Sequence, residues 1–169
     1  MTIVGTAVAV ALIVTIVVFV IGDDSTDSAA SGPTAPASVA CVGLKDPLPT
    51  GAPKVTIPAG PAPIELETDD LVVGKGAVVT ADDEEIEVNY LGVTCRTGKI
   101  FDSSWSRNAT LKASLAGGLI DGWREGIPGM REGGRRILRI PPELAYGQSG
   151  GPGIPPNEPL IFVVDLVKA

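Results

Sequence analysis

The sequence LIDGWREGIPG at residues 119–129 decides the fold, because it predicts one short helix that a sheet can enclose. Its apolar side chains recur at offsets of three and four, which places them on one helical face: Leu119, Ile120, Trp123 and Ile127. Burying the indole removes about 150–250 Å² from water, or roughly 4–6 kcal/mol before entropy is subtracted. Gly126 and Pro128 end the helix, because proline lacks a backbone donor and disfavours helical geometry before it. Alone, the stretch indicates a core helix.

Strand patterns surround this helix. Ile86, Val88 and Tyr90 alternate with polar residues, which predicts a strand over residues 85–95 with one apolar face. Residues 96–99 predict a turn, since Gly98 makes positive φ inexpensive, and residues 100–102 return as the hairpin partner. Further strands are predicted at 55–57, 63–66, 111–115, 135–140 and 160–168, with 69–76 as a connecting turn and 103–108 as a polar bulge or flap. Hairpin spacing around one helix predicts an α+β fold with an antiparallel sheet.

Composition narrows the chemistry. The net charge of −7 argues against a nucleic-acid partner, because phosphate binding needs clustered Lys and Arg. The chain contains 0 histidines, which excludes histidine-based triads and histidine metal ligands. Its 2 cysteines are too few for a structural zinc site. We therefore predict neither a metal nor a cofactor.

Residues 1–22 form a candidate transmembrane anchor or signal segment, since residues 3–21 are uncharged and strongly apolar. A helix of that length spans about 28 Å, close to the ~30 Å hydrocarbon core. We favour a single-pass anchor in the cell membrane, because a basic n-region is missing and the apolar run exceeds a usual h-region. Asp23 and Asp24 follow it, and we place the bulk of the chain outside the cytoplasm. Secretion after signal cleavage remains the alternative.

Residues 23–63 are rich in Ser, Ala, Pro and Gly and read as a disordered or extended linker, because they contain few large apolar side chains. Cys41 lies in this linker and Cys95 in the folded part, so the two form a candidate disulfide in an exported protein. Such a bridge would stabilise the fold by about 4 kcal/mol in the chain-entropy treatment. Two unpaired thiols are the other possibility.

Three segments occur in order in the remaining chain. They are VNYLG (88–92) with GKIFDSS (98–104), LIDGW (119–123) with GIPGM (126–130), and IPPELAYG (140–147) with GIPPN (153–157) and LIF (160–162). At these residues the chain resembles the FKBP-type peptidyl-prolyl cis-trans isomerases, of an exported or membrane-anchored bacterial type. The resemblance implies an isomerase domain over residues 64–169, with a five- to six-stranded antiparallel sheet wrapped around one short α-helix.

The resemblance also implies a substrate pocket between helix and sheet. Its implied catalytic residues are Asp102, Tyr146 and Phe101, and its implied substrate-binding residues are Tyr90, Arg107, Leu111, Leu119, Ile120, Trp123, Ile154 and Phe162. Trp123 would lie under the proline ring, the Ile120 N–H would donate to a substrate carbonyl, and Arg107 would pair with Asp102. Three positions depart from the family pattern: Leu111 replaces an aromatic residue, and Gly118 and Gly151 replace longer side chains.

Such a site needs no nucleophile. Rotation about the peptide bond is opposed by ~18–20 kcal/mol of lost resonance, and a pocket that binds the twisted amide preferentially lowers that barrier.

The expected partners are proline-containing polypeptides, with macrolide inhibitors as candidate ligands and the membrane as a third partner through the N-terminal segment. A non-catalytic peptide-binding chaperone of the same fold is the alternative function, and Trp123, Phe162 and Tyr90 taken singly are equally consistent with plain core residues.

Overall fold

The computed structural model describes residues 40–81, 83 and 85–169. The predicted membrane segment and the first part of the predicted linker lie outside these residues. Within them, none of the helices combines the length and the apolar character that a bilayer span requires.

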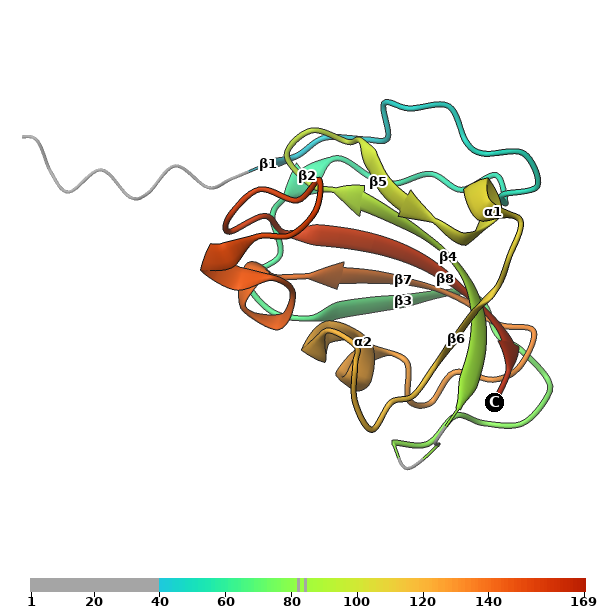
Figure 1. Cartoon of the computed structure of the whole chain (residues 1–169). Helices are drawn as coiled ribbons and strands as arrows, with labels where there is room; N and C mark the ends of the chain where they lie inside the picture. The colour runs from blue at the N-terminus through green and yellow to red at the C-terminus, as the bar shows by residue number, and fades with distance from the viewer. Residues whose placement is uncertain (1–39, 82, 84) are drawn as a thin grey trace, which may run out of the picture. The chain divides into compact units, whose positions relative to one another are not determined.

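An antiparallel sheet of six strands forms the centre of the domain (Figure 1). Its strands, in spatial order, are β3 (Glu67–Val72), β7 (Arg135–Ile140), β8 (Leu160–Lys168), β4 (Ile86–Thr94) and β5 (Ile100–Ser103), with β6 (Leu111–Ala113) also paired to β4. Helix α2 (Asp121–Gly126) packs on one face, and the short helix α1 (Ser104–Arg107) follows β5. Two 3₁₀ turns, η1 (Pro142–Leu144) and η2 (Gly147–Ser149), precede β8. The predicted sheet and its central helix are confirmed, although the domain has two short helices rather than one.

The central strands of the sheet, β4 and β8, are buried on both faces. On β4, Val88 and Tyr90 belong to a core cluster that includes Trp123 of α2. Leu91 and Val93, which point to the other face, belong to a second cluster. Side chains of a strand alternate between faces, so the two cores explain why the alternating first half of β4 is followed by the uninterrupted non-polar run at residues 90–93.

The second core is covered by residues 40–63, here called the arm. Its ends, β1 (Ala40–Cys41) and β2 (Gly60–Pro61), pair with each other, and Cys41 and Ile57 are buried. The expectation of a disordered linker is therefore wrong for residues 40–63, which pack on the sheet as part of the domain. The few apolar side chains of the arm are enough to order it, because they pack on the apolar face that the sheet provides. Residues 55–57 and 63–66, expected as strands, are not strands.

Two segments differ from the expected local structure. Residues 69–76 were predicted as a turn, but Glu67–Val72 forms the edge strand β3. Its acidic residues are accommodated by β7, because Arg136 donates to Asp70 at 2.6 Å and Arg139 lies 3.4 Å from Glu67. The polar segment after β5 begins a helical turn, since the Ser103 hydroxyl caps the backbone of α1.

Helix α2 lies unusually close to the sheet. A Cβ atom on Gly122 would lie 2.5 Å from the Ile140 side chain, and one on Gly126 would lie 2.8 Å from Leu138. The two glycines therefore permit the close approach that places Trp123 against the strands. The helix begins at Asp121, so Leu119 and Ile120, expected on its apolar face, lie just before it instead.

Candidate active site

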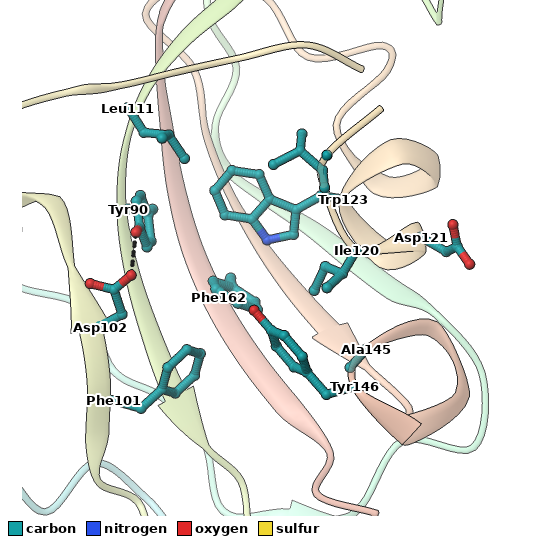
Figure 2. Close-up of a pocket in the computed structure, with 12 residues that line it drawn as sticks. Tyr90, Phe101, Asp102, Leu111, Ile120, Asp121, Trp123, Ala145, Tyr146 and Phe162 are labelled. Carbon is teal, nitrogen blue, oxygen red and sulfur yellow. Dashed lines mark hydrogen bonds between the residues drawn. The ribbon is translucent and has the colours of Figure 1, made fainter. Parts of the chain in front are cut away.

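A cavity of about 450 Å³ opens between α2, the sheet and the segment after η1 (Figure 2). We call it the main cavity. It is lined by Tyr90, Phe101, Asp102, Leu111, Gly118, Leu119, Ile120, Asp121, Trp123, Ala145, Tyr146 and Phe162. Its volume falls within the range of pockets that bind small molecules.

Aromatic rings form the inner wall of the main cavity. Trp123 is 3% exposed, and its ring meets those of Tyr90 and Phe162 edge to face, each with centroids 5.3 Å apart. Phe101 meets Phe162 in the same way at 5.6 Å. Edge-to-face pairs are the preferred aromatic geometry, so the rings hold one another in place. The Trp123 Nε1–H is buried and has no hydrogen-bond partner among the described residues.

Gly92 makes this aromatic arrangement possible. It pairs with Phe162 on one side and with Asp102 on the other. A Cβ atom there would lie 2.6 Å from the Phe101 ring and 2.9 Å from the Phe162 ring, closer than carbon atoms can approach. Gly92 lies within the VNYLG motif but is not among the predicted site residues. A glycine inside a strand pattern, which often marks a close approach, was the available signal.

The polar wall is centred on Asp102. Its carboxylate accepts hydrogen bonds from the Tyr90 hydroxyl, from Arg107 and, at 2.7 Å, from the Ser103 backbone N–H. Arg107 also donates to the Tyr90 hydroxyl at 2.7 Å. The expected pairing of Arg107 with Asp102 is thus present, and these donors hold the carboxylate in one orientation at the cavity edge.

Two pKa shifts follow from this cluster. Burial raises the pKa of the Tyr90 hydroxyl, and its hydrogen bond to Asp102 raises it further. The hydrogen bond to Tyr90 raises the pKa of Arg107 despite partial burial, and the nearby carboxylate of Asp102 acts in the same direction. At neutral pH Tyr90 therefore remains a donor and Arg107 remains a cation.

Tyr146 and Ile120 contribute donors from the other side of the main cavity (Figure 2). Ile120 is the residue before α2, so its N–H has no partner inside the helix. Tyr146 is 40% exposed and follows η1. Gly151, one of the departures from the family pattern, lies against its ring, since a Cβ atom there would be 3.1 Å from it. The loop of residues 147–157 thereby supports Tyr146 with its backbone.

The structure brings most of the expected site residues together. Arg107 and Ile154 are the exceptions. Arg107 reaches the main cavity only through Asp102 and Tyr90, and Ile154 is 6% exposed in the core cluster beside the cavity. Asp121, Ala145 and Gly118 line the cavity although they were not predicted as site residues. Asp121 and Gly118 directly flank the predicted residues Leu119 and Ile120, and Ala145 directly precedes Tyr146, so adjacency in the chain was the available signal.

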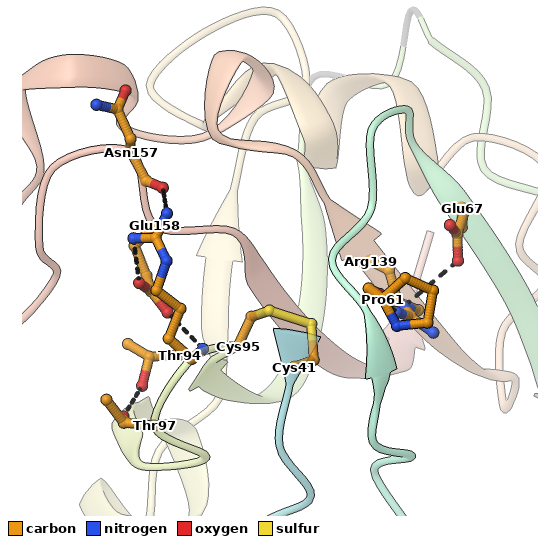
Figure 3. Close-up of a disulfide and its surroundings, with 10 residues drawn as sticks. Cys41, Pro61, Glu67, Thr94, Cys95, Thr97, Arg139, Asn157 and Glu158 are labelled. Atoms are coloured by element: carbon orange, nitrogen blue, oxygen red, sulfur yellow. Dashed lines mark hydrogen bonds and ion pairs between the residues drawn. A yellow bond between two sulfur atoms is a disulfide. The ribbon is translucent and has the colours of Figure 1, made fainter. Parts of the chain in front are cut away.

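The arm holds the hairpin that carries Phe101 and Asp102. The candidate pair Cys41 and Cys95 forms a disulfide that joins β1 to the end of β4 (Figure 3). Val42 donates to the Cys95 carbonyl at 2.8 Å, and the Asp46 carboxylate accepts from the Ile100 N–H at 2.8 Å. Ile100 directly precedes Phe101 and Asp102 in the chain, so this hydrogen bond fixes the backbone next to both residues. The arm therefore supports the hairpin that carries Phe101 and Asp102.

A second contact fixes the same hairpin on its other side. Arg96, in the β4–β5 turn, donates to the buried carboxylate of Glu158 at 2.9 Å and to the Asn157 carbonyl at 2.7 Å (Figure 3). Glu158 is 2% exposed and also accepts from the Arg96 backbone N–H. A buried carboxylate satisfied in this way is a strong restraint, and it ties the turn to the end of the loop of residues 147–157.

Comparison with known proteins agrees with this geometry. Residues 76–167 match the family described as FKBP-type peptidyl-prolyl cis-trans isomerase. The chain is 49% identical over 117 residues to a probable FK506-binding protein of Corynebacterium glutamicum, covering 69% of this chain and 98% of the relative. It is 47% identical over 118 residues to an FK506-binding protein of Streptomyces anulatus, covering 68% and 94%.

Solved structures show the same similarity. The crystal structure of AtFKBP13 superposes with a TM-score of 0.57 at 38% identity, covering 64% of this chain and 96% of that one. The crystal structure of FkpA from Escherichia coli gives a TM-score of 0.57 at 44% identity, covering 61% and 47%. The fold described above therefore recurs in related proteins.

Proposed function

Because this chain belongs to the family of FKBP-type peptidyl-prolyl cis-trans isomerases, we propose that it catalyses X–Pro isomerisation by holding the proline ring against Trp123 while the amide twists. The observation that carries this proposal is the buried Trp123 at the inner wall of a cavity flanked by Asp102 and Tyr146. An apolar ring suits the proline side chain, and the nearby Ile120 N–H and Tyr146 hydroxyl are donors suited to its adjoining carbonyls.

The cavity lowers the barrier to amide rotation by removing water from the amide. A planar amide is strongly dipolar, and twisting it removes the resonance that creates the dipole. Transfer from water into an aromatic cavity therefore destabilises the planar amide more than the twisted one. Preferential binding of the twisted state raises the rate, and no covalent intermediate or proton transfer is required.

Fixed donors complete the mechanism. The Ile120 N–H and the Tyr146 hydroxyl hold substrate carbonyls, so that rotation occurs about one bond while the neighbouring chain stays in place. Asp102 faces them as a carboxylate whose orientation is set by Tyr90, Arg107 and the backbone. Preorganised polar groups stabilise a transition state without reorganising during the reaction, which is the contribution we assign to this cluster.

We propose that the enzyme acts on exported proteins, as a single-pass membrane protein with its isomerase domain outside the cytoplasm. The disulfide between Cys41 and Cys95 supports this location, because disulfides persist in oxidising compartments and are rare in the cytosol. The apolar run at residues 3–21 supports the anchor. The N-terminal residue of the protein isolated from cells tests it. A chain that starts within residues 23–40 would instead indicate a secreted, cleaved form.

FK506-type macrolides are the inhibitors we expect to compete for the main cavity. The relatives from Corynebacterium glutamicum and Streptomyces anulatus carry the name FK506-binding protein. Leu111 and Gly118 line the cavity where the family pattern has larger side chains, so we expect weaker contact with a large ring. A competition measurement between FK506 and a Leu-Pro peptide tests this expectation.

The direct test of function is an isomerisation assay on a Leu-Pro peptide with the full chain in mild detergent. We expect acceleration that is lost on Tyr146→Phe or Asp102→Ala, while peptide binding persists. An active control is Lys112→Gln, which removes an exposed ion pair with Glu85, and neither of these residues lines the main cavity. Binding without acceleration in the unmodified protein would instead favour the non-catalytic chaperone.

A further inference from the structure

A second hollow of about 380 Å³ adjoins the main cavity. It lies between the β4–β5 turn and the loop of residues 147–157. Its lining consists of Thr94, Thr97, Lys99, Ile100, Phe101, Gly153 and Pro155. Phe101 lines both spaces, so a single side chain separates them.

A polypeptide substrate must extend beyond the main cavity in both directions. An extended chain advances about 3.3 Å per residue, so the residues next to the proline reach past the cavity walls. One of those walls is Phe101, and beyond it lies the second hollow. A Cβ atom on Gly153 would lie 4.0 Å from the Phe101 Cβ, so the loop backbone runs directly alongside this wall and continues it.

The walls of the second hollow are held in place before any substrate binds. The Gly98 carbonyl accepts from the Lys45 N–H at 2.8 Å, and the Ile100 N–H donates to Asp46 at 2.8 Å. The hydroxyls of Thr94 and Thr97 lie 2.6 Å apart in a hydrogen bond. A preformed site loses less entropy on binding, which favours its use by a mobile chain.

The charges around the hollow favour an anion. Lys99 lines it, Lys45 lies beside the same turn, and both are exposed without an ion pair in the part of the chain that the structure describes. Asp46, the nearby carboxylate, accepts from the Ile100 N–H but keeps its negative charge, so the two lysines leave a local excess of one positive charge. These cations stand out in a chain whose net charge is −7.

We propose that the second hollow is a subsite for the client residues beside the proline, and that Lys99 selects a client with an acidic side chain there. This inference rests on the proposed isomerase function, and it adds a specificity that the main cavity does not supply. Continuity through Phe101 and charge complementarity at Lys99 are the two observations that identify the occupant as the substrate chain itself.

The test uses Leu-Pro peptides in which one residue outside the Leu-Pro pair is varied. Three such positions, before or after the pair, are tested one at a time, each with Glu, Gln or Lys. The full-length protein should show, at one of these positions, a kcat/KM for Glu that is about two- to fivefold above Lys, the scale of an exposed ion pair. Lys99→Glu should reverse this order. High salt should remove it, because exposed charges are screened.

Lys75→Glu is the matched control, because it makes the same charge change on an exposed loop next to Glu132. It should keep the preference of the unmodified protein for Glu. A flat profile at every position, or a reversal by Lys75→Glu as well, would overturn the proposal. The Gln peptides are the neutral reference. If no peptide is accelerated, the isomerase function is refuted. If all peptides are accelerated equally, only the subsite is refuted.

Discussion

Arg107 donates a hydrogen bond to the Tyr90 hydroxyl at 2.7 Å while its guanidinium carbon lies 5.5 Å from the centre of the Tyr90 ring. One cation thus contacts both the polar tip and the face of the same aromatic residue. Because Tyr90 in turn donates to Asp102, the three side chains act as a unit, and the first prediction concerns its middle member.

Tyr90→Phe should lower kcat/KM by about two- to tenfold, the equivalent of one lost hydrogen bond. The ring and its packing on Trp123 remain, but Asp102 loses one of the donors that orient it. Peptide isomerisation assays measure the loss, and chemical denaturation serves as the control for folding. Unchanged activity in a stably folded variant would show that the orientation of Asp102 does not matter.

Gly92→Ala should reduce activity roughly tenfold and destabilise the fold by about 1–3 kcal/mol, as overpacked cores do. The new methyl group would displace the Phe101 and Phe162 rings, which lie within 2.9 Å of its position. Gly60→Ala is the matched control, because nothing lies within 4 Å of a Cβ atom there. If both variants show the same activity and stability, the close approach at Gly92 does not contribute to function.

Replacing both cysteines, as in Cys41→Ala with Cys95→Ala, should lower the free energy of unfolding by about 2–5 kcal/mol. The arm would remain attached through Val42, Lys45 and Asp46, so we expect a folded protein with a lower Tm. A reducing agent should lower the Tm of the unmodified protein and leave the double variant unchanged. Equal sensitivity of both proteins to the reductant would argue against the bridge.

The Asp70–Arg136 pair predicts a pH dependence of stability. The hydrogen bond from Arg136 lowers the pKa of Asp70 below its ordinary value of 3.8. A carboxyl whose pKa is lower in the folded state stabilises that state above about pH 3.8, and the contribution is lost as the pH falls through the folded pKa.

Asp70→Asn should therefore be less stable than the unmodified protein at pH 6, by no more than about 1 kcal/mol because Asp70 is partly exposed. The difference should shrink below pH 3.8. Denaturant titrations at several pH values measure it, with Asp69→Asn as the control on the same strand. A difference that persists at pH 2 would mean that the amide perturbs β3 for a reason other than charge.

Local patterns predicted much of the domain. The alternation in β4, the turn at Gly98, the pattern of β8 and the helix around Trp123 all appear as expected. The expectation failed at β3 and in the arm. Both segments are polar or proline-rich, and their order depends on partners distant in sequence, such as Arg136 for Asp70 and the outer sheet face for Ile57. Nothing within those segments reveals such partners.

The candidate site was likewise predictable from the sequence only in part. Family motifs in the sequence identified several residues that do gather around one cavity: Trp123, Asp102, Tyr146, Leu119 and Ile120. They did not reveal why Gly92 is needed, that Ile154 is in the core, or that the arm supports the hairpin. Each of these depends on distances between segments far apart in the chain.

The stretch at residues 119–129 illustrates both contributions. By itself, the sequence determined that a short helix with a buried tryptophan would form there, because apolar spacing and a terminating proline act locally. Only the tertiary structure decided that the helix begins after Ile120, leaving that backbone N–H free, and that Gly122 and Gly126 bring Trp123 against the sheet. Packing between distant residues determines these features, since close contact is a property of the assembled surfaces and not of either segment alone.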